Sequence, residues 1–218
     1  MSARRGRRAG STAKRRNAAG GPLERAARTV LDDAARAMER MSEKSAAAVA
    51  AAAEAMIASL GAGGTIFYCG NGGSAADAQH MAAELAGRYL LDRPPLPAVA
   101  LTTNTSALTA IGNDYGFSQV FSRQLDALAM PGDVLVAVTT SGGSSNVLAA
   151  VRAARRRRVV TVGLTGRKGM AFARRCDHAL VVPEISTPRI QESHLVMGHA
   201  LCELIERALF GAMRPPRG

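Results

Sequence analysis

Short apolar segments alternate with segments of helical periodicity along most of the chain. The apolar segments predict strands at residues 65–69, 97–101, 133–138, 159–164 and 179–182. Helices are expected between and after them, at residues 74–89, 105–111, 117–129, 144–157 and 188–209. Strands that are apolar throughout and separated by helices are typical of a parallel sheet with helices on both faces. The pattern therefore predicts an α/β fold, a three-layer α/β/α sandwich.

An alanine-rich stretch precedes this alternation. Residues 22–60 contain few helix breakers, so we expect two helices there that meet near Ser42. Gly61, Gly63 and Gly64 would end the second of them. We therefore expect an N-terminal helical pair that precedes the sandwich in the chain.

Positive charge is concentrated at the start of the chain. Residues 1–20 contain seven Arg or Lys and no acid, out of a formal net charge of +11 over 218 residues. Because this stretch has too few apolar residues to fold, we expect a basic, disordered extension at 1–21 and one domain at 22–218. The extension is either a solvated tail or a weak nucleic-acid binder acting through phosphate contacts. A second basic run, at 155–158, falls at the end of a predicted helix, where cations complement the helix dipole.

Several classes of protein are excluded by what the sequence lacks. No apolar stretch approaches the eighteen residues of a membrane-spanning helix, and none follows Arg16 as in a secretory signal. The three cysteines, Cys69, Cys176 and Cys202, have no metal-binding or redox spacing. We therefore expect a reduced, cytoplasmic protein.

Two loops that follow predicted strands have the composition of anion sites. Residues 70–75 satisfy the G-x-G-x-x-A pattern of dinucleotide sites, but residues 102–104 lack the acid that would hold a ribose. Residues 139–145 contain five hydroxyl side chains and two glycines at a helix start, without the lysine of a nucleotide triphosphatase. The second loop alone is equally well an ordinary serine-rich turn. Both loops on neighbouring strands favour a phosphorylated small molecule.

Histidines and acids occur on two of the predicted helices. His80 and Glu84 are four residues apart and share a helix face, which suits either a solvated pair or metal and acid–base chemistry. The last helix contains Gln191, His194 and His199 among apolar residues, where a hydrogen-bonded core histidine is the usual arrangement. Gln191 and His199 are about 12 Å apart along that helix, so they would have to approach a common ligand from two sides.

Taken together and in order, these motifs resemble those of the phosphoheptose isomerases, which belong to the sugar isomerase (SIS) family. The residues that carry the resemblance are Gly70, Asn71, Gly72, Gly73, Ser74, His80, Glu84, Asn113, Asp114, Thr139, Thr140, Ser141, Ser144, Arg189, Ile190, Gln191, Glu192 and His199. The resemblance runs from about Leu23 to the end of the chain. Five motifs in the same order are far more specific than any one of them.

The resemblance implies a five-stranded parallel sheet flanked by helices, assembled as a homotetramer with active sites between subunits. It also implies an aldose–ketose isomerase that interconverts sedoheptulose 7-phosphate and D-glycero-D-manno-heptose 7-phosphate through an enediol. That reaction is the first step of activated heptose biosynthesis.

The resemblance also assigns roles by position. Glu84 would be the base that moves a proton between C1 and C2, and His199 the acid–base partner at the oxygens. The implied phosphate-binding residues are Thr139, Thr140, Ser141 and Ser144. The other implied substrate-binding residues are Gly70, Asn71, Gly72, Gly73, Ser74, His80, Glu84, Asn113, Asp114 and Gln191. The implied ligands of a zinc ion are His80, Glu84, Gln191 and His199.

The chemistry agrees with these roles. Isomerisation through an enediol needs a carboxylate-strength base, a group that exchanges protons with oxygen, and stabilisation of the enediolate charge. Zinc would supply the last of these, although ligation lowers the basicity of Glu84, so its two roles compete. Pro188 stands where some relatives have an acid that touches the substrate.

Two other functions stay open. The first is a non-catalytic SIS-domain binding protein of the kind that associates with the bacterial replication initiator. Such proteins lack acid–base residues at the positions of Glu84 and His199, both of which are present here. The second is an isomerase of another sugar phosphate, which pocket length would decide.

Overall fold

The computed structural model describes residues 21–211. The chain divides into two compact units, residues 1–33 and residues 34–218. In the first unit the described residues are almost entirely the beginning of helix α1 (Pro22–Gly61). The predicted basic extension lies outside the described residues except for Gly21.

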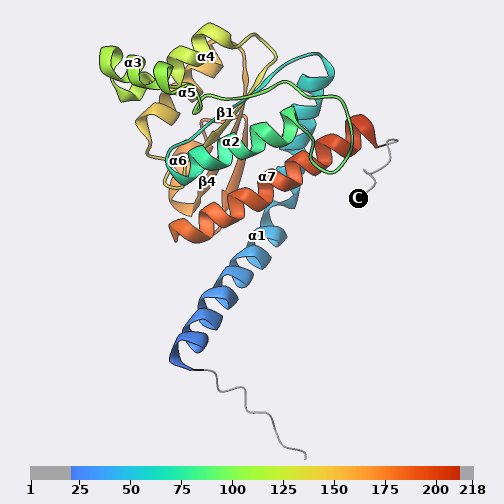
Figure 1. The fold of residues 1–218 in the computed structure, drawn as a ribbon, viewed down its shortest axis with the longest axis vertical. Coiled ribbons are helices and arrows are strands. Elements are labelled where there is room, and N and C mark those ends of the chain that lie inside the picture. Colours follow the sequence, from blue (N-terminus) through green and yellow to red (C-terminus); the bar gives the residue numbers. More distant parts are fainter. Residues whose placement is uncertain (1–20, 212–218) are drawn as a thin grey trace, which may run out of the picture. The chain divides into compact units, whose positions relative to one another are not determined.

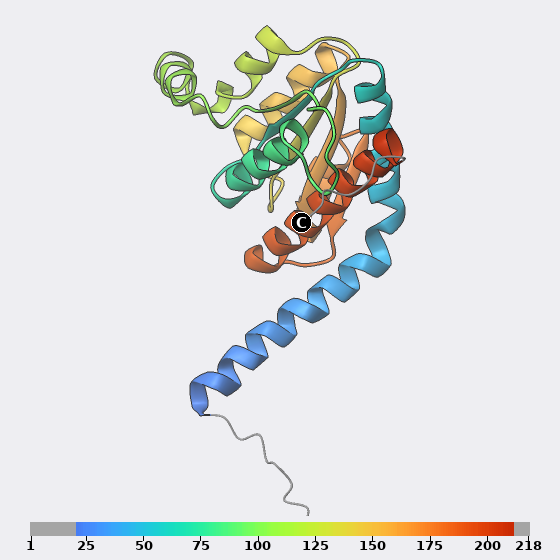
Figure 2. The ribbon, with the colours of Figure 1, turned by 45° about the vertical axis from the view of Figure 1, so that its right-hand side comes forward.

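The second unit contains one sheet of five parallel strands in the order β2-β1-β3-β4-β5 (Figures 1 and 2). The strands are β1 (Ile66–Cys69), β2 (Ala98–Ala100), β3 (Val134–Val138), β4 (Val160–Gly166) and β5 (His178–Val182). All five coincide with the apolar segments of the sequence to within two residues at their ends. The predicted parallel sheet is confirmed.

Helices cover both faces of this sheet, because successive strand residues point to opposite sides. Ile66 and Tyr68 of β1 lie in a core shared with α1, α2 and α7, whereas Phe67 and Cys69 lie in a second core shared with α4, α5 and α6. The helices are α2 (Gly73–Ala86), α3 (Thr105–Tyr115), α4 (Ser122–Leu128), α5 (Ser145–Arg156), α6 (Met170–Ala173) and α7 (Thr187–Phe210). The α/β/α sandwich is confirmed.

The N-terminal helical pair is wrong: α1 is a single helix, without a break at Ser42. Neither Gly nor Pro occurs between Pro22 and Gly61, and the buried residues Met41, Ser45 and Val49 keep one helical stripe across the expected break.

Other elements also differ from prediction. Helix α3, expected at residues 105–111, continues to Tyr115. Helix α2 ends at Ala86 rather than at residue 89, and the segment 117–129 is divided into a 3₁₀ turn, Phe117–Gln119, and helix α4. The short helix α6 was not predicted, since a four-residue helix shows no periodicity.

The strand order β2-β1-β3-β4-β5 predicts a ligand-binding crevice between β1 and β3. In sheets with this order the crossover connections leave in opposite directions at that point, outside the carboxyl ends of the two strands. Cys69 at the end of β1 is paired with Ala137 of β3. The two loops with anion-site composition therefore begin side by side.

No helix among the described residues is long and apolar enough to span a membrane. The three cysteines are all free.

Candidate active site

A pair of amide side chains joins the two loops at the crevice. Asn71 follows β1, and Asn146 lies in the first turn of α5, after β3. Each amide donates to the other's oxygen, at 2.9 Å from Asn71 Nδ2 and 2.8 Å from Asn146 Nδ2. Asn146 is 2% exposed and was not predicted as a site residue. The sequence shows only an asparagine after Ser144 and Ser145, a pattern that is also typical of an ordinary helix cap.

The loop after β3 gathers hydroxyl groups at the start of α5. Thr139 Oγ1 is 3.1 Å from Ser144 Oγ, and the Gly142 amide donates to Thr139 Oγ1 at 3.2 Å. Ser144 occupies the N-cap position, but its side chain makes no capping hydrogen bond to the helix. Ser141 Oγ accepts from the Gly143 amide at 3.3 Å. Neutral hydroxyls and a helix N-terminus are the elements of a phosphate site without lysine.

Gly142 is needed in this loop for two reasons. Its φ is +73°, a conformation that favours glycine, and a Cβ there would lie 2.7 Å from Gly169 Cα. The backbone of the loop is thus packed against the turn that follows β4. Thr140 closes the same contact, because its carbonyl accepts from the Gly166 amide at 3.1 Å.

The glycine loop after β1 lies against the start of α7. A Cβ on Gly73 would be 2.3 Å from Gln191 Nε2, so a larger residue there would displace the end of that side chain. Ser74, in the first turn of α2, is buried at 3% exposure, and a Cβ on Gly70 would meet its carbonyl oxygen at 2.5 Å. Gln191 therefore reaches the N-terminal end of α2.

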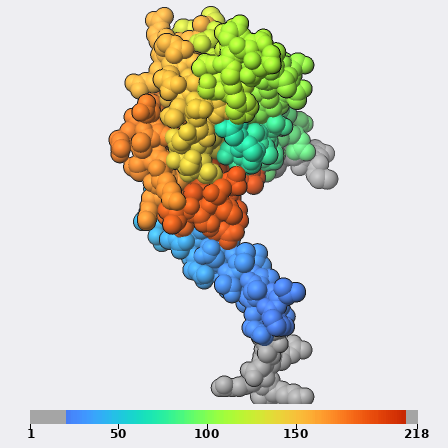
Figure 3. All heavy atoms as spheres, turned by 90° about the vertical axis from the view of Figure 1, so that its left-hand side faces the viewer, coloured from blue at the N-terminus to red at the C-terminus, as the bar shows by residue number. Residues whose placement is uncertain are grey.

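Helices α2 and α7 run side by side in the same direction (Figures 1 and 2). Gln191 of α7 contacts the start of α2. Farther along both helices, a Cβ on Gly198 of α7 would be 2.4 Å from the side chain of Met81 of α2. This close approach brings His80 of α2 beside His199 of α7. On the surface in Figure 3, α2 (teal), the start of α5 (yellow) and α7 (red) are neighbours.

The centre of the site is formed by these two histidines and Glu84. His80 Nε2 lies 2.9 Å from His199 Nε2 and 3.5 Å from Glu84 Oε1. At 2.9 Å one ring nitrogen must donate and the other accept, so one imidazole carries its hydrogen on Nε2 and the other does not. The side chains of His80 and Glu84 are 44% and 22% exposed, which leaves them open to a ligand. Tyr89, which was not predicted as a site residue, adds a ring whose centroid is 5.6 Å from that of His199.

The donor types of this cluster fit zinc. Imidazole nitrogens and a carboxylate oxygen bind zinc at about 2.0–2.2 Å, which places neighbouring ligand atoms roughly 3–3.5 Å apart. His199 Nε2 and Glu84 Oε1 stand at about this spacing from His80 Nε2. Within residues 21–211, however, no group of three or more His, Cys, Asp or Glu side chains is already arranged around a metal position. Binding would exchange the histidine–histidine hydrogen bond for bonds to the metal.

Two predicted residues are not brought to the cluster in this chain. Asn113 Nδ2 donates to Asp114 Oδ1 at 2.8 Å, and both side chains are exposed. They lie on α3, a helix with no buried residues. Any role in substrate binding would have to be exercised from that exposed surface.

His194 is a core histidine. It is fully buried on the inner side of α7, and burial lowers the pKa of its imidazole to about 4. Glu192 is not in the cluster either, because it pairs with Arg189 at 2.6 Å.

The chain is similar to known proteins over most of its length. A family model described as the SIS domain matches residues 30–166. The phosphoheptose isomerase of Rhodospirillum rubrum is 55% identical over 162 residues, 74% of this chain and 86% of the relative. That of Solidesulfovibrio magneticus is 56% identical over 183 residues, 84% of this chain and 89% of the relative.

Two solved phosphoheptose isomerases share the fold. The structure from Neisseria gonorrhoeae superposes with a TM-score of 0.80 at 47% identity, covering 84% of this chain and 98% of that one. The structure from Francisella tularensis gives a TM-score of 0.82 at 37% identity, covering 86% and 100%.

Proposed function

The chain belongs to the SIS domain family, and from its likeness to the phosphoheptose isomerases we propose that it interconverts sedoheptulose 7-phosphate and D-glycero-D-manno-heptose 7-phosphate. This is the first step of activated heptose biosynthesis. The observation that carries the proposal is the cluster of His80, Glu84 and His199, which lies on the two helices whose first turns border the crevice. A binding module has no need of a carboxylate and two imidazoles at such a place.

The loop after β3 binds the phosphate of the substrate. Thr139, Thr140, Ser141 and Ser144 offer hydroxyls, and the start of α5 offers amides and the positive end of its dipole. The glycine loop at the start of α2 begins beside this phosphate loop. Along α2, His80 is six residues beyond Ser74, about 9 Å of helix rise. The phosphate and the reacting carbons of an open sugar chain can thus lie at separate places in one crevice.

Proton transfer belongs to the cluster on α2 and α7. The Glu84 carboxylate takes the proton from C2 of the aldose and returns it to C1, while His199 moves a proton between O2 and O1. The hydrogen bond to His80 lets His199 give up one proton and regain another. The products are one ketose and the enzyme in its original protonation state.

Turnover of sedoheptulose 7-phosphate by the wild type, Glu84→Gln and His199→Gln tests this assignment. Each variant should lose activity by on the order of 10²- to 10⁴-fold, because each removes one proton-transfer group. Glu203→Gln is the matched control: it makes the same change on α7, in a side chain paired with the exposed Arg207. If a folded wild type that binds phosphate shows no turnover, the activity is wrong, and other sugar phosphates or a binding role come next.

We also propose that His80, Glu84, Gln191 and His199 hold a zinc ion. The support is the set of donor types and, for Glu84 and His199, the spacing of their atoms from His80 Nε2. When bound, zinc would polarise the substrate's carbonyl oxygen and stabilise the charge of the enediolate. Metal analysis of the purified protein should find zinc in the wild type and much less in His80→Gln. Zinc-free wild type that stays fully active with a chelator would contradict the proposal.

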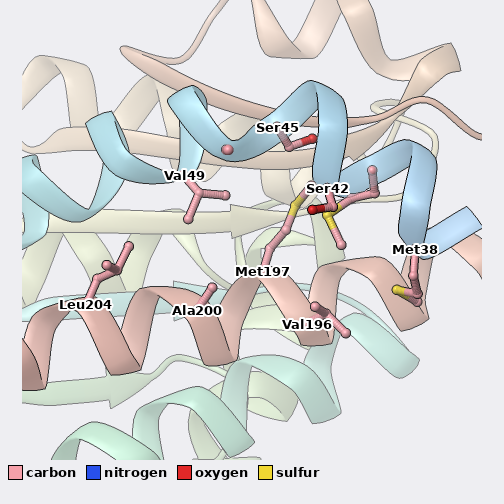
Figure 4. A pocket seen from close by; sticks show the side chains of 10 residues that line it. Met38, Ser42, Ser45, Val49, Val196, Met197, Ala200 and Leu204 are labelled. Carbon is pink, nitrogen blue, oxygen red and sulfur yellow. The ribbon is translucent and has the colours of Figure 1, made fainter.

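We propose further that the chain forms a homotetramer with active sites between subunits. The second unit has an apolar groove where Met38 and Val49 of α1 face Val196 and Leu204 of α7 (Figure 4). Val196 and Leu204 are 45% and 38% exposed. Exposed apolar side chains that line a groove are typical of a protein–protein interface. In such an assembly, the exposed Asn113 would bind substrate at the active site of a neighbouring chain.

A further inference from the structure

A buried ion pair outside the cluster holds the segment between α2 and β2. The carboxylate of Glu206, on α7, accepts the backbone amides of Tyr89, Leu90 and Leu91 at 2.8, 2.8 and 2.9 Å. It also accepts from Arg93 Nε at 2.8 Å. The side chains of Arg93 and Glu206 are 0% and 1% exposed. Burial alone would raise the pKa of Glu206, but these donors hold it below its ordinary value.

The other end of the pair closes helix α2. Arg93 Nη2 donates to the carbonyl of Glu84 at 2.8 Å, and Nη1 donates to those of Leu85 and Gly87 at 2.8 and 3.2 Å. These are carbonyls at the end of a helix, which have no partner within it. One guanidinium thus satisfies the backbone of the residue that carries the proposed base.

The pair touches both helices of the cluster and the ring that lies on it. Through Arg93 it holds the last turn of α2, and through Glu206 it belongs to α7, about two turns beyond His199. Through the amide of Tyr89 it sets the ring that packs against His199. A shift of one helix along the other would break these hydrogen bonds and separate His80 from His199.

We propose that Arg93 and Glu206 are positioning residues, which hold α2 and α7 in the register that brings Glu84, His80 and His199 together. The inference rests on the proposed isomerase function for its kinetic consequences. Its geometric content does not depend on the reaction. A buried pair of this kind is costly to desolvate, and fixing one arrangement of the chain is a use that accounts for it.

The test is Glu206→Gln, with Glu203→Gln as the matched control on the same helix. The substitution at position 206 removes the charge and turns an amide group toward backbone donors. At a temperature where both variants are fully folded by circular dichroism, Glu206→Gln should lower kcat by on the order of tenfold or more, with KM nearly unchanged. Glu203→Gln should leave both at the wild-type value. A merely structural role would lower the melting temperature of Glu206→Gln and leave kcat of the folded protein intact, which would overturn the proposal.

A second readout is independent of activity. The chain has four histidines, so imidazole NMR signals can be assigned by substitution. Glu206→Gln should shift the signals of His80 and His199 and leave that of His178, on β5, in place. Unchanged His80 and His199 signals would overturn the proposal even where the isomerase assignment stands. Shifted signals in a protein without turnover would uphold the positioning role and reject the assigned reaction.

If Glu206→Gln does not fold, Glu206→Asp and Arg93→Lys are the milder variants. Both variants keep the charge. Aspartate is shorter than glutamate, and lysine lacks the several donor nitrogens of arginine, so fewer of the hydrogen bonds to residues 84–91 can form. The same loss of kcat and the same shift of the two histidine signals are expected in smaller measure. Wild-type kcat and unchanged signals in both variants would overturn the proposal.

Discussion

Asn146 exchanges two hydrogen bonds with Asn71, so its amide decides which way the Asn71 side chain faces. In Asn146→Asp the new carboxylate still accepts from Asn71 Nδ2 but cannot donate to Asn71 Oδ1. It also places a nearly buried negative charge beside the proposed phosphate loop. We expect the free energy of unfolding to fall by about 1–3 kcal/mol and KM for the sugar phosphate to rise. Urea denaturation and steady-state kinetics measure the two effects.

Asn104→Asp is the control for that substitution. Asn104 caps α3 by accepting from the Ala107 amide at 3.0 Å, and an aspartate accepts the same bond. Stability should therefore be nearly unchanged. Equal effects of the two substitutions would contradict the special role of Asn146.

His194 makes stability depend on pH. Its ordinary pKa near 6.5 is lowered to about 4 by burial, so between these values the unfolded chain binds a proton that the folded chain does not. The stability present above pH 6.5 is therefore lost as the pH falls toward 4, at no more than about 1.4 kcal/mol per pH unit. His194→Leu removes this titration. Its unfolding free energy should fall less between about pH 7 and about pH 4.5 than that of the wild type, and parallel pH curves would contradict the argument.

At the scale of elements, the two neighbouring strands β1 and β3 were the most predictable, because both are covered on both faces. Every residue of β1 and β3 is buried, so the sequence shows an unbroken apolar run at each. The phosphate loop was predictable for a related reason. A turn that must approach an anion needs small and hydroxyl residues, and these stand together between Thr139 and Ser145.

Helix ends were less predictable, because residues far away in sequence decide them. The pattern continues α2 to residue 89, yet the amide of Tyr89 bonds to Glu206, which is more than a hundred residues later. Asn146 was missed for the same reason, since its partner Asn71 belongs to another loop. Residue type and spacing carry no signal of such pairs.

At the scale of the whole molecule, assembly is the remaining question. Apart from the groove of α1 and α7, exposed apolar side chains occur near the start of α1, where Leu23 and Leu31 are 86% and 68% exposed. The groove, which lies wholly in the second unit, allows a test that does not depend on the basic extension.

The double variant Val196→Asp and Leu204→Asp is expected to fold but not to assemble. Both side chains are partly exposed in one chain, so charges are tolerated there, whereas an interface would have to desolvate them at a cost of several kcal/mol each. Light scattering on a sizing column should show wild type at a multiple of 22.7 kDa and the variant at or near that mass. Met130→Asp, at a 62% exposed position before β3, is the control and should keep the wild-type mass.

Turnover then separates two arrangements of the assembly. If active sites lie between subunits, the dissociated variant should lose activity although Glu84 and His199 are intact, and activity should rise with the fraction of any residual oligomer. If each chain carries a complete site, the monomer stays active. A double variant that keeps the wild-type mass would show that the groove is not the interface.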